Sequence, residues 1–285
     1  MERVESMDFI VLNLGHAKTT HAWGNRDHSS PFVRLYYVKK GRAVLHLPQG
    51  DFEVTEGHMY LIQSYVPHSY ECDPGFEFFY MFLFQRRYDT VNIFDQYDFP
   101  LEVKSNDATR LLFEGYCNLY PQLNLPFLSA EDFDNHPTFH AYAQAYMNMA
   151  DYERLQLHGL VEIIVSYFVK HSTPQLFTKD ERLSKVIKYI AENVQKPLSV
   201  EELADIACLT PSYLIRSFKK SFGITPLQYI IKKKIQHAQK LLLSTELPIQ
   251  TIAAMAGFDD ASYFIRLFKK NIGLTPQIYR ENLIG

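Results

Sequence analysis

The stretch SYLIRSFKKSFGITPLQY (residues 212–229) recurs 50 residues later as SYFIRLFKKNIGLTPQIY (residues 262–279). Eleven of the 18 positions are identical, and the similarity extends upstream into residues 203–207 and 252–256. Two copies are too few for a solenoid, which needs at least about three stacked repeats. The repeat therefore indicates two copies of one small structural module.

Each copy has the pattern of a helix–turn–helix unit. In the first copy, Ser199 is a good N-cap, and Glu202 completes a capping box for the first helix. The second helix begins near Pro211 and ends before Gly223, because glycine readily takes the positive φ of a helix C-cap. We expect the second helix to bury three side chains, which are Tyr213, Leu214 and Phe218.

Residues 226–243, between the copies, are predicted to form one continuous helix, because apolar residues recur there at steps of three and four. Lys232, Lys233 and Lys234 fall mainly off this apolar stripe. About 18 residues at ~1.5 Å each span ~27 Å, and successive major-groove faces of B-DNA lie ~34 Å apart. A rigid linker of about this length could place two recognition helices in adjacent major grooves on one side of the duplex. A plain helical bundle is the alternative, but the repeat also keeps Arg and Lys positions.

The charge of the chain is unevenly distributed. Residues 1–177 hold 13 Lys+Arg and 22 Asp+Glu, whereas residues 178–285 hold 16 Lys+Arg and 10 Asp+Glu. The net charge of −3 is therefore the sum of −9 and +6. A basic module joined to an acidic one suggests a polyanionic partner for the basic part.

The repeat resembles the DNA-binding domain of the AraC/XylS family of bacterial transcription regulators. The resemblance covers residues 183–283 and is most specific in the second copy, GFxxxSYFxRxFKKxxGxTPxxYR, which starts at Gly257 and ends at Arg280. It implies an all-α domain with two helix-turn-helix motifs bridged by a long helix, bound to double-stranded promoter DNA. It also implies a partnership with RNA polymerase.

The resemblance places the DNA-binding residues on the exposed face of each second helix. Base-reading positions are then Ser212, Ile215 and Arg216 in the first copy and Ala261, Ser262 and Arg266 in the second. At Ile215 we expect contact with a thymine methyl group or no readout. The expected phosphate contacts are made by lysines or by helix N-termini, namely Lys219, Lys220, Lys269, Lys270, Thr225 and Thr275.

The N-terminal part has the pattern of an all-β domain. Short β-prone runs at residues 33–38, 42–47, 51–54, 58–62 and 76–84 are separated by Gly and Pro, which suggests a sandwich or barrel. The segment Lys39-Lys40-Gly41 is a predicted hairpin turn. The run from Phe76 to Phe84 is apolar at every position but Glu77, so we expect a strand buried on both faces.

The order of Gly41, Gly57 and Pro67-His68 before an aromatic strand resembles the cupin-like sensor barrel of AraC-type regulators. In metal-binding cupins a His-x-His pair is followed by a Glu and a later His. Here the corresponding residues are His46, Pro48, Glu53 and His68, and the proline breaks the set. We therefore expect no metal and no cofactor.

The barrel is predicted to bind a small-molecule effector, with a carbohydrate as the candidate class. A sugar site needs aromatic faces and a few polar groups, and the spacing around Gly41 is similar to that of a sugar-responsive family member. The alternative for each candidate residue is a purely structural role in the core. The candidate ligand-binding residues are Trp23, Arg26, Arg34, Tyr36, His68, Tyr70, Tyr80 and Phe82.

Residues 104–177 change to helical periodicity, with one apolar stripe at 108, 111, 112 and 116 and another at 157, 160, 161, 164, 167 and 168. The family uses helices here to form a dimer; burial against the barrel alone is the alternative. The expected domains are the sensing barrel, 1–103; the helical dimerisation segment, 104–171; the linker, 172–181; and the DNA-binding domain, 182–285.

The whole sequence predicts a ligand-responsive, DNA-binding transcription regulator, more typically an activator, and not an enzyme. A cupin-type metalloenzyme with a DNA-binding tail and an orphan regulator without an effector are the alternatives. No apolar run approaches the ~18 residues of a membrane span, no signal peptide is visible, and the scattered Cys72, Cys117 and Cys208 favour a reducing compartment. We expect a cytoplasmic protein that does not enter a membrane.

Overall fold

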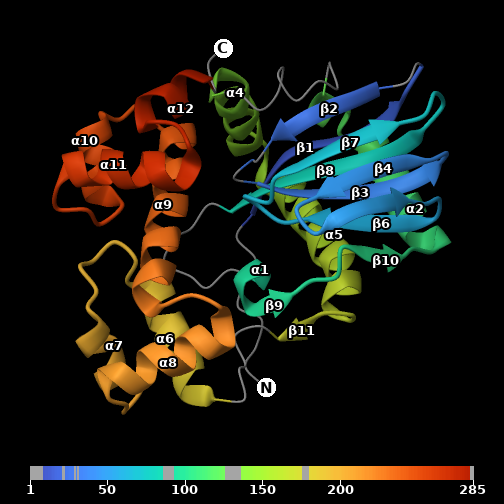
Figure 1. Ribbon diagram of the computed structural model, residues 1–285. Helices are drawn as coiled ribbons and strands as arrows, with labels where there is room; N and C mark the ends of the chain where they lie inside the picture. The colour runs from blue at the N-terminus through green and yellow to red at the C-terminus, as the bar shows by residue number, and fades with distance from the viewer. Residues whose placement is uncertain are drawn as a thin grey trace. The chain divides into compact units, whose positions relative to one another are not determined.

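The computed structural model describes residues 9–20, 23–28, 30, 32–85, 93–125, 136–174 and 180–282. For residues 23–28, 85, 95–96, 136–140, 174 and 282 it describes the backbone but not the side chains. The chain divides into two compact units (Figure 1). One unit comprises residues 1–86 and 99–173, and the other comprises residues 87–98 and 174–285.

The strands of the first unit form two antiparallel sheets. The five-stranded sheet has the order β1-β8-β3-β6-β10, and the four-stranded sheet has the order β2-β7-β4-β5. This confirms the predicted all-β domain, although the described strands pair within two separate sheets and do not close into one barrel. The strands are β1 Phe9–Lys18, β2 Trp23–His28, β3 Val33–Lys40, β4 Ala43–Leu47, β5 Gly50–Val54, β6 His58–Ile62, β7 His68–Cys72, β8 Glu77–Gln85 and β10 Glu102–Lys104.

The predicted hairpin at Lys39-Lys40-Gly41 is wrong. Strand β3 pairs with β6 and β8, whereas β4 pairs with β5 and β7 in the other sheet. Gly41, with a φ of +91°, lies where the chain crosses between the sheets. Because β3 is central and its side chains Leu35 and Val38 are fully buried, burial selects its distant neighbours over the strand next in sequence.

Strand β8 is buried on both faces, as predicted. Phe78, Tyr80 and Phe82 face the four-stranded sheet, and Phe79 and Met81 face the other way. On that other side the ring of Phe79 lies 6.0 Å from that of Phe113 in helix α2. The helical elements of this unit are α2 Asp107–Leu119, the 3₁₀ helix η1 Pro121–Leu123, α4 His136–Met147 and α5 Asp151–Val169.

The second unit contains the two predicted helix-turn-helix modules. Helix α9 (Pro226–Ser244) runs from the first module to the second (Figure 1). It contributes Ile230 to the core of the first module and Ile235, Ala238 and Leu242 to that of the second. The remaining helices are α6 Glu181–Glu192, α7 Val200–Ile206, α8 Pro211–Phe222, α10 Ile249–Met255, α11 Ala261–Ile272 and α12 Pro276–Asn282.

Residues 87–98 contain the short helix α1 (Ile93–Gln96) and strand β9 (Tyr97–Asp98). Strand β9 pairs with β11 (Thr173–Pro174) in a two-stranded sheet. Residues 175–179 of the predicted linker lie outside the described residues. In the part of the chain that the structure describes, no helix combines the length and the apolar character that crossing a bilayer requires.

Candidate nucleic-acid interface and small-molecule pocket

Helices α8 and α11 begin and end in the same way. The Thr210 side chain accepts a hydrogen bond from the backbone N–H of Tyr213 (3.3 Å), and Asp260 caps α11 by accepting from Tyr263 (2.9 Å). Each helix ends at a glycine in the left-handed region, Gly223 with φ +74° and the equivalent glycine of α11 with φ +86°. The repeat therefore fixes the length and the register of both helices.

Each of these helices buries only two large side chains. Leu214 and Phe218 point into the core of the first module, and Phe264 and Phe268 point into that of the second. The two residues of each pair are four positions apart, so they lie on the same face of the helix. The opposite face is exposed. Most of the predicted DNA-binding residues lie on this face: Ser212, Ile215, Arg216, Lys219 and Lys220 on α8 and Ser262, Arg266, Lys269 and Lys270 on α11 are exposed, and Ala261 is partly buried.

The prediction that Tyr213 is buried is wrong. Its side chain is 42% exposed, and its repeat partner Tyr263 is 46% exposed. The buried row at 214 and 218 fills the core, so the residue before it points outward. The Arg216 guanidinium lies 5.8 Å from the Tyr213 ring, within range of a cation–π contact.

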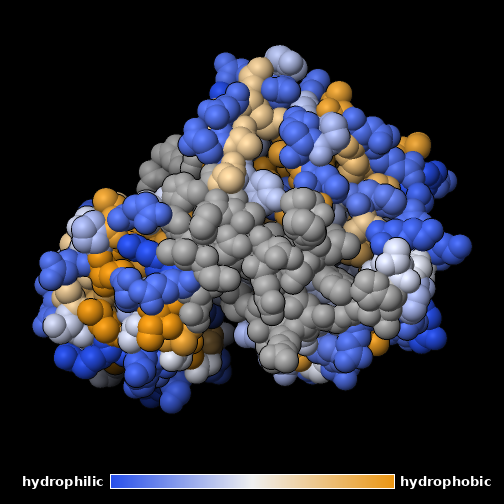
Figure 2. Space-filling model, turned by 90° about the horizontal axis from the view of Figure 1, so that it is seen from above, coloured by the Kyte–Doolittle hydropathy of each residue, from blue (hydrophilic) through white to orange (hydrophobic). Residues whose placement is uncertain are grey.

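Two further residues of the exposed face were missed by the sequence analysis. Ile265 is 37% exposed and occupies the position of Ile215, which is 38% exposed. Tyr263 likewise occupies the position of Tyr213. The offset of 50 residues could have identified Ile265 through Ile215. It could not have identified Tyr263, because the equivalent Tyr213 was predicted to be buried. Hydrophobic surface lies among hydrophilic patches on this unit, at the left of Figure 2.

Thr225 and Thr275 act as N-caps. The Oγ1 atom of Thr225 accepts a hydrogen bond from the Gln228 N–H (3.3 Å), and that of Thr275 accepts from the Ile278 N–H (3.2 Å). The Gln228 side chain in turn accepts from the Thr225 N–H (2.9 Å) and completes a capping box. Their hydroxyl groups are thus already engaged in starting helices α9 and α12, and phosphate contact at these two helix N-termini stays a prediction.

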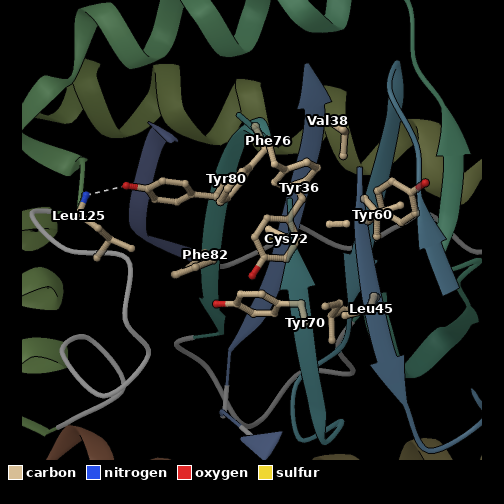
Figure 3. A pocket seen from close by; sticks show the side chains of 14 residues that line it. Tyr36, Val38, Leu45, Tyr60, Tyr70, Cys72, Phe76, Tyr80, Phe82 and Leu125 are labelled. Carbon is tan, nitrogen blue, oxygen red and sulfur yellow. Dashed lines mark hydrogen bonds between the residues drawn. The ribbon is translucent and has the colours of Figure 1, made fainter. Parts of the chain in front are cut away.

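The first unit contains a pocket between its two sheets (Figure 3). The pocket holds about 620 Å³ of space, part of it open to solvent. Its walls follow from the strand alternation, which turns every second residue of β3, β4, β6, β7 and β8 inward. The lining residues are Tyr36, Val38, Ala43, Leu45, Val54, Tyr60, Ile62, Tyr70, Cys72, Phe76, Phe78, Tyr80, Phe82 and Leu125.

Four of the eight predicted ligand-binding residues line this pocket: Tyr36, Tyr70, Tyr80 and Phe82. Trp23 and Arg26 belong to β2, and their side chains lie outside the described part of the chain. The sequence analysis missed ten lining residues, most of them apolar, because which face of a strand turns inward depends on the sheet register. The missed residues are Val38, Ala43, Leu45, Val54, Tyr60, Ile62, Cys72, Phe76, Phe78 and Leu125.

Arg34 and His68 are buried but are not lining residues. An Arg34 Nη1 atom lies 3.1 Å from Nε2 of His68, and Nη2 donates to the Ser30 hydroxyl (2.8 Å). The guanidinium carbon lies 4.8 Å and 5.2 Å from the centres of the Phe32 and Phe82 rings. Because His68 Nδ1 lies 2.9 Å from the Val66 carbonyl, which can only accept, Nε2 accepts from Arg34 and the imidazole is neutral.

Burial controls the ionisation of the pocket side chains. It raises the pKa of the Cys72 thiol to about 12, and burial together with a hydrogen bond to Glu102 raises the pKa of Tyr60 to about 12. Burial also raises the pKa of Tyr80. These groups are therefore neutral near pH 7, and none of the described lining residues offers a charge to a ligand.

The residues that correspond to a cupin metal site do not converge. Strand β4 places His46 opposite Ser69, and β5 places Glu53 opposite Val44. Since Leu45 and Tyr70 point into the pocket, His46 and Glu53 point away from it, on the face opposite to His68. Within the described ranges, no group of three or more His, Cys, Asp or Glu side chains is arranged to hold a metal ion.

Comparison with known proteins agrees with both units. Residues 13–102 match the AraC-like ligand binding domain, and residues 203–282 match a helix-turn-helix domain. The probable transcriptional regulator LumQ of Photobacterium leiognathi is 37% identical over 86 residues, which cover 30% of this chain and 35% of that protein. The lactose operon transcription activator of Staphylococcus xylosus is 31% identical over 104 residues, which cover 36% of this chain and 37% of that protein. The matches thus span little more than a third of either relative.

A match to a solved structure extends along nearly the whole chain. The crystal structure of an apo ToxT variant from Vibrio cholerae aligns with 99% of this chain and 100% of its own, at a TM-score of 0.50 and 12% sequence identity. At that identity it supports the fold alone. With an AraC-like ligand-binding domain followed by an AraC-type helix-turn-helix domain, the chain belongs to the AraC/XylS family.

Proposed function

We propose that this protein is a sequence-specific, DNA-binding transcription regulator that responds to a small molecule in its N-terminal pocket. The observation that carries the proposal is the pair of matched exposed faces on α8 and α11. Arg216 and Arg266, and the lysine pairs that follow them, occupy equivalent positions on these faces. One helix, α9, supports both modules. Arginine reads guanine edges, and lysine neutralises phosphates.

We propose one role for each predicted domain. Residues 1–103 sense the effector, residues 104–171 mediate dimerisation, residues 172–181 link the parts and residues 182–285 bind DNA. We take activation through contact with RNA polymerase as the mode of action, because the Staphylococcus xylosus relative is named an activator. Two relatives are named for the lactose and arabinose operons, and they support a carbohydrate as one candidate effector.

Two helices of the first unit carry the surface for a homodimer. Leu111 and Leu119 of α2 are 58% and 56% exposed, and Leu155 and Ile163 of α5 are 74% and 44% exposed. Helix α2 buries Thr109 and Phe113, so Leu111 of the predicted apolar stripe stays available for a partner subunit. Hydrogen bonds place the two helices side by side and antiparallel: Asn106 Nδ2 donates to the Tyr167 hydroxyl (3.2 Å), and the Tyr120 hydroxyl donates to Gln156. We propose that these exposed apolar side chains of both helices lie in the dimer interface.

The test is DNA binding by the purified full chain. Fluorescence anisotropy with promoter fragments and with random duplexes, over a range of salt concentrations, measures both specificity and counterion release. We expect a Kd that is lower for one promoter than for random duplex, and a log Kd that rises with log salt. Equal, salt-insensitive affinity for every duplex would refute the proposed function.

A further inference from the structure

A cation from outside the repeat lies beside the first proposed recognition helix. Arg182 is the second residue of α6, and its side chain is 46% exposed. Its guanidinium carbon lies 5.8 Å from the centre of the Tyr213 ring in α8, within range of a cation–π contact. Helices α6 and α8 contribute Leu183 and Leu214 to one core (Figure 1). This shared core holds the start of α6 next to the start of α8.

The Tyr213 ring joins Arg182 to the proposed DNA-reading face. Tyr213 lies in the first turn of α8, and the Arg216 guanidinium lies 5.8 Å from the same ring. The N-terminal residues of a recognition helix contact base edges, so the phosphates that border the groove lie just beyond this turn. The position of Arg182 therefore suits a contact with the DNA backbone, whereas Arg216 suits a contact with a base.

The equivalent ring of the second module has different surroundings. The Tyr263 ring meets the Phe258 ring edge-on, with 6.3 Å between the two ring centres. Tyr213 and Tyr263 thus occupy the same place in the repeat but pack against different side chains. The contact between Tyr213 and Arg182 is a feature of the first module and does not follow from the repeat itself.

A carboxylate holds the Arg182 guanidinium in the structure. The Nε and Nη2 atoms of Arg182 donate to Oδ1 and Oδ2 of Asp180, at 2.8 and 2.7 Å. An arginine makes the same pair of parallel hydrogen bonds to a phosphate group. The guanidinium also holds the pKa of the Asp180 carboxyl below its usual range, so both groups are charged near neutral pH. A phosphate and Asp180 would therefore compete for the same two donors.

From this geometry we propose that Arg182 is a phosphate-binding residue of the first module, and that Asp180 weakens DNA binding by occupying its guanidinium. The inference rests on the proposed function, because α8 has to enter the major groove before Arg182 reaches a phosphate. When DNA binds, phosphate oxygens replace the carboxylate oxygens of Asp180 on the guanidinium. The Asp180 carboxylate is then solvated by water.

DNA binding by the purified full chain, measured at several salt concentrations, tests the proposed phosphate contact. Arg182→Gln should raise the Kd about three- to tenfold and lower the slope of log K against log salt by about one unit. Promoter fragments and random duplexes should be affected alike, because a phosphate contact carries no sequence information. Lys188→Gln is the matched control: it removes an equal charge at another exposed position of α6 and should leave the Kd within about twofold.

Asp180→Asn tests the competition. Asp180 is the N-cap of α6, and asparagine is an equally good N-cap, so the helix should keep its start. Glu181→Gln removes a neighbouring exposed carboxylate and measures the effect of charge alone. Asp180→Asn should lower the Kd for both kinds of duplex about two- to fivefold beyond that effect, as expected for one exposed ion pair. In a chain that also carries Arg182→Gln, the two substitutions should have equal effects.

The same titrations separate failure of this inference from failure of the proposed function. An Arg182→Gln chain with the Kd and the salt slope of Lys188→Gln would overturn the phosphate contact and leave Arg182 a structural residue at the start of α6. An equal effect of Asp180→Asn with and without Arg182 would overturn the competition. In both cases wild-type binding to the promoter persists and the proposed function stands. A wild-type chain without specific, salt-sensitive binding would refute the proposed function and this inference with it.

Discussion

The buried ammonium group of Lys234, in the middle of helix α9, donates a hydrogen bond to the carbonyl oxygen of Gly257 in the turn between α10 and α11. Gly257 has a φ of +81°, and a Cβ atom there would lie 2.7 Å from the carbonyl oxygen of Gln195, beyond helix α6. Helix α9, the turn between α10 and α11 and the segment after α6 therefore meet at one point. The sequence analysis placed Lys234 off the apolar stripe, but it is only 7% exposed.

Replacing Lys234 by methionine should lower the stability of the second unit. Methionine is also long and unbranched, but it leaves the Gly257 carbonyl without this donor, and an unsatisfied buried acceptor costs about 1–3 kcal/mol. Burial lowers the pKa of Lys234, which means that the buried charge is itself unfavourable. Removing this charge therefore offsets part of the loss in stability. We expect the free energy of unfolding, measured by chemical denaturation, to fall by about 1 kcal/mol. Lys232→Met, on the exposed side of the same helix, is the control and should stay within about 0.5 kcal/mol of wild type.

The equivalent turn of the first module holds Cys208 where the second module has Gly257. Cys208 has a φ of +51° and is exposed. A non-glycine residue in this region costs about 1–2 kcal/mol, and glycine gives back about 0.5–1 kcal/mol through the greater freedom of the unfolded chain. Cys208→Gly should therefore raise the free energy of unfolding by about 0.5–1 kcal/mol.

Cys208→Ala provides the comparison. It removes the thiol but keeps a Cβ atom at positive φ, so its unfolding free energy should match that of wild type. If both substitutions stabilise the protein equally, the thiol and not the backbone conformation is responsible. Denaturant unfolding of the two variants under reducing conditions distinguishes these results.

The sequence predicted the features that depend on residues close together in the chain and failed on those that depend on distant residues. Helix α8 was bounded correctly from Pro211 and Gly223, because capping and positive φ act within a few residues. The partners of β3 were wrong, because strand pairing depends on residues far along the chain. Three of the predicted ligand-binding tyrosines, Tyr36, Tyr70 and Tyr80, line the pocket. Leu45 and Val54 gave no signal in the sequence, since only the sheet register decides that they face inward.

Arg216 and Arg266 are predicted to read bases. Arg216→Ala and Arg266→Ala should each weaken binding to the specific promoter by about 1–3 kcal/mol, with little change on random duplex. Lys269→Ala should instead weaken both and reduce the slope of log K against log salt by about one unit. Anisotropy titrations at several salt concentrations measure all three. Equal losses on both duplexes for the arginine variants would show that these residues contact the phosphate backbone only.

Dimerisation is predicted to depend on the exposed face of α2 and α5. Leu155→Glu and Leu119→Glu place a charge on apolar surface that a dimer would bury, so each should weaken the dimer by more than about tenfold. Sedimentation equilibrium over a concentration series measures the change. The matched control is Leu227→Glu, which alters a leucine 51% exposed in the second unit and should leave the dimer intact. A wild-type chain that remains monomeric at all concentrations would rule out this surface as an interface.

Acid should destabilise the protein through His237 of α9. This side chain is 4% exposed, and burial lowers its pKa to about 4, against about 6.5 for the unfolded chain. Between these values the unfolded chain binds a proton that the folded chain does not, so stability falls as the pH decreases from about 6.5 to 4. A difference of this size corresponds to about 3 kcal/mol. Denaturant unfolding from pH 7 to pH 4 should show this loss of unfolding free energy in wild type and not in His237→Gln. All other groups titrate equally in both proteins. Parallel pH profiles of the two proteins would therefore mean that His237 ionises alike in the folded and unfolded states.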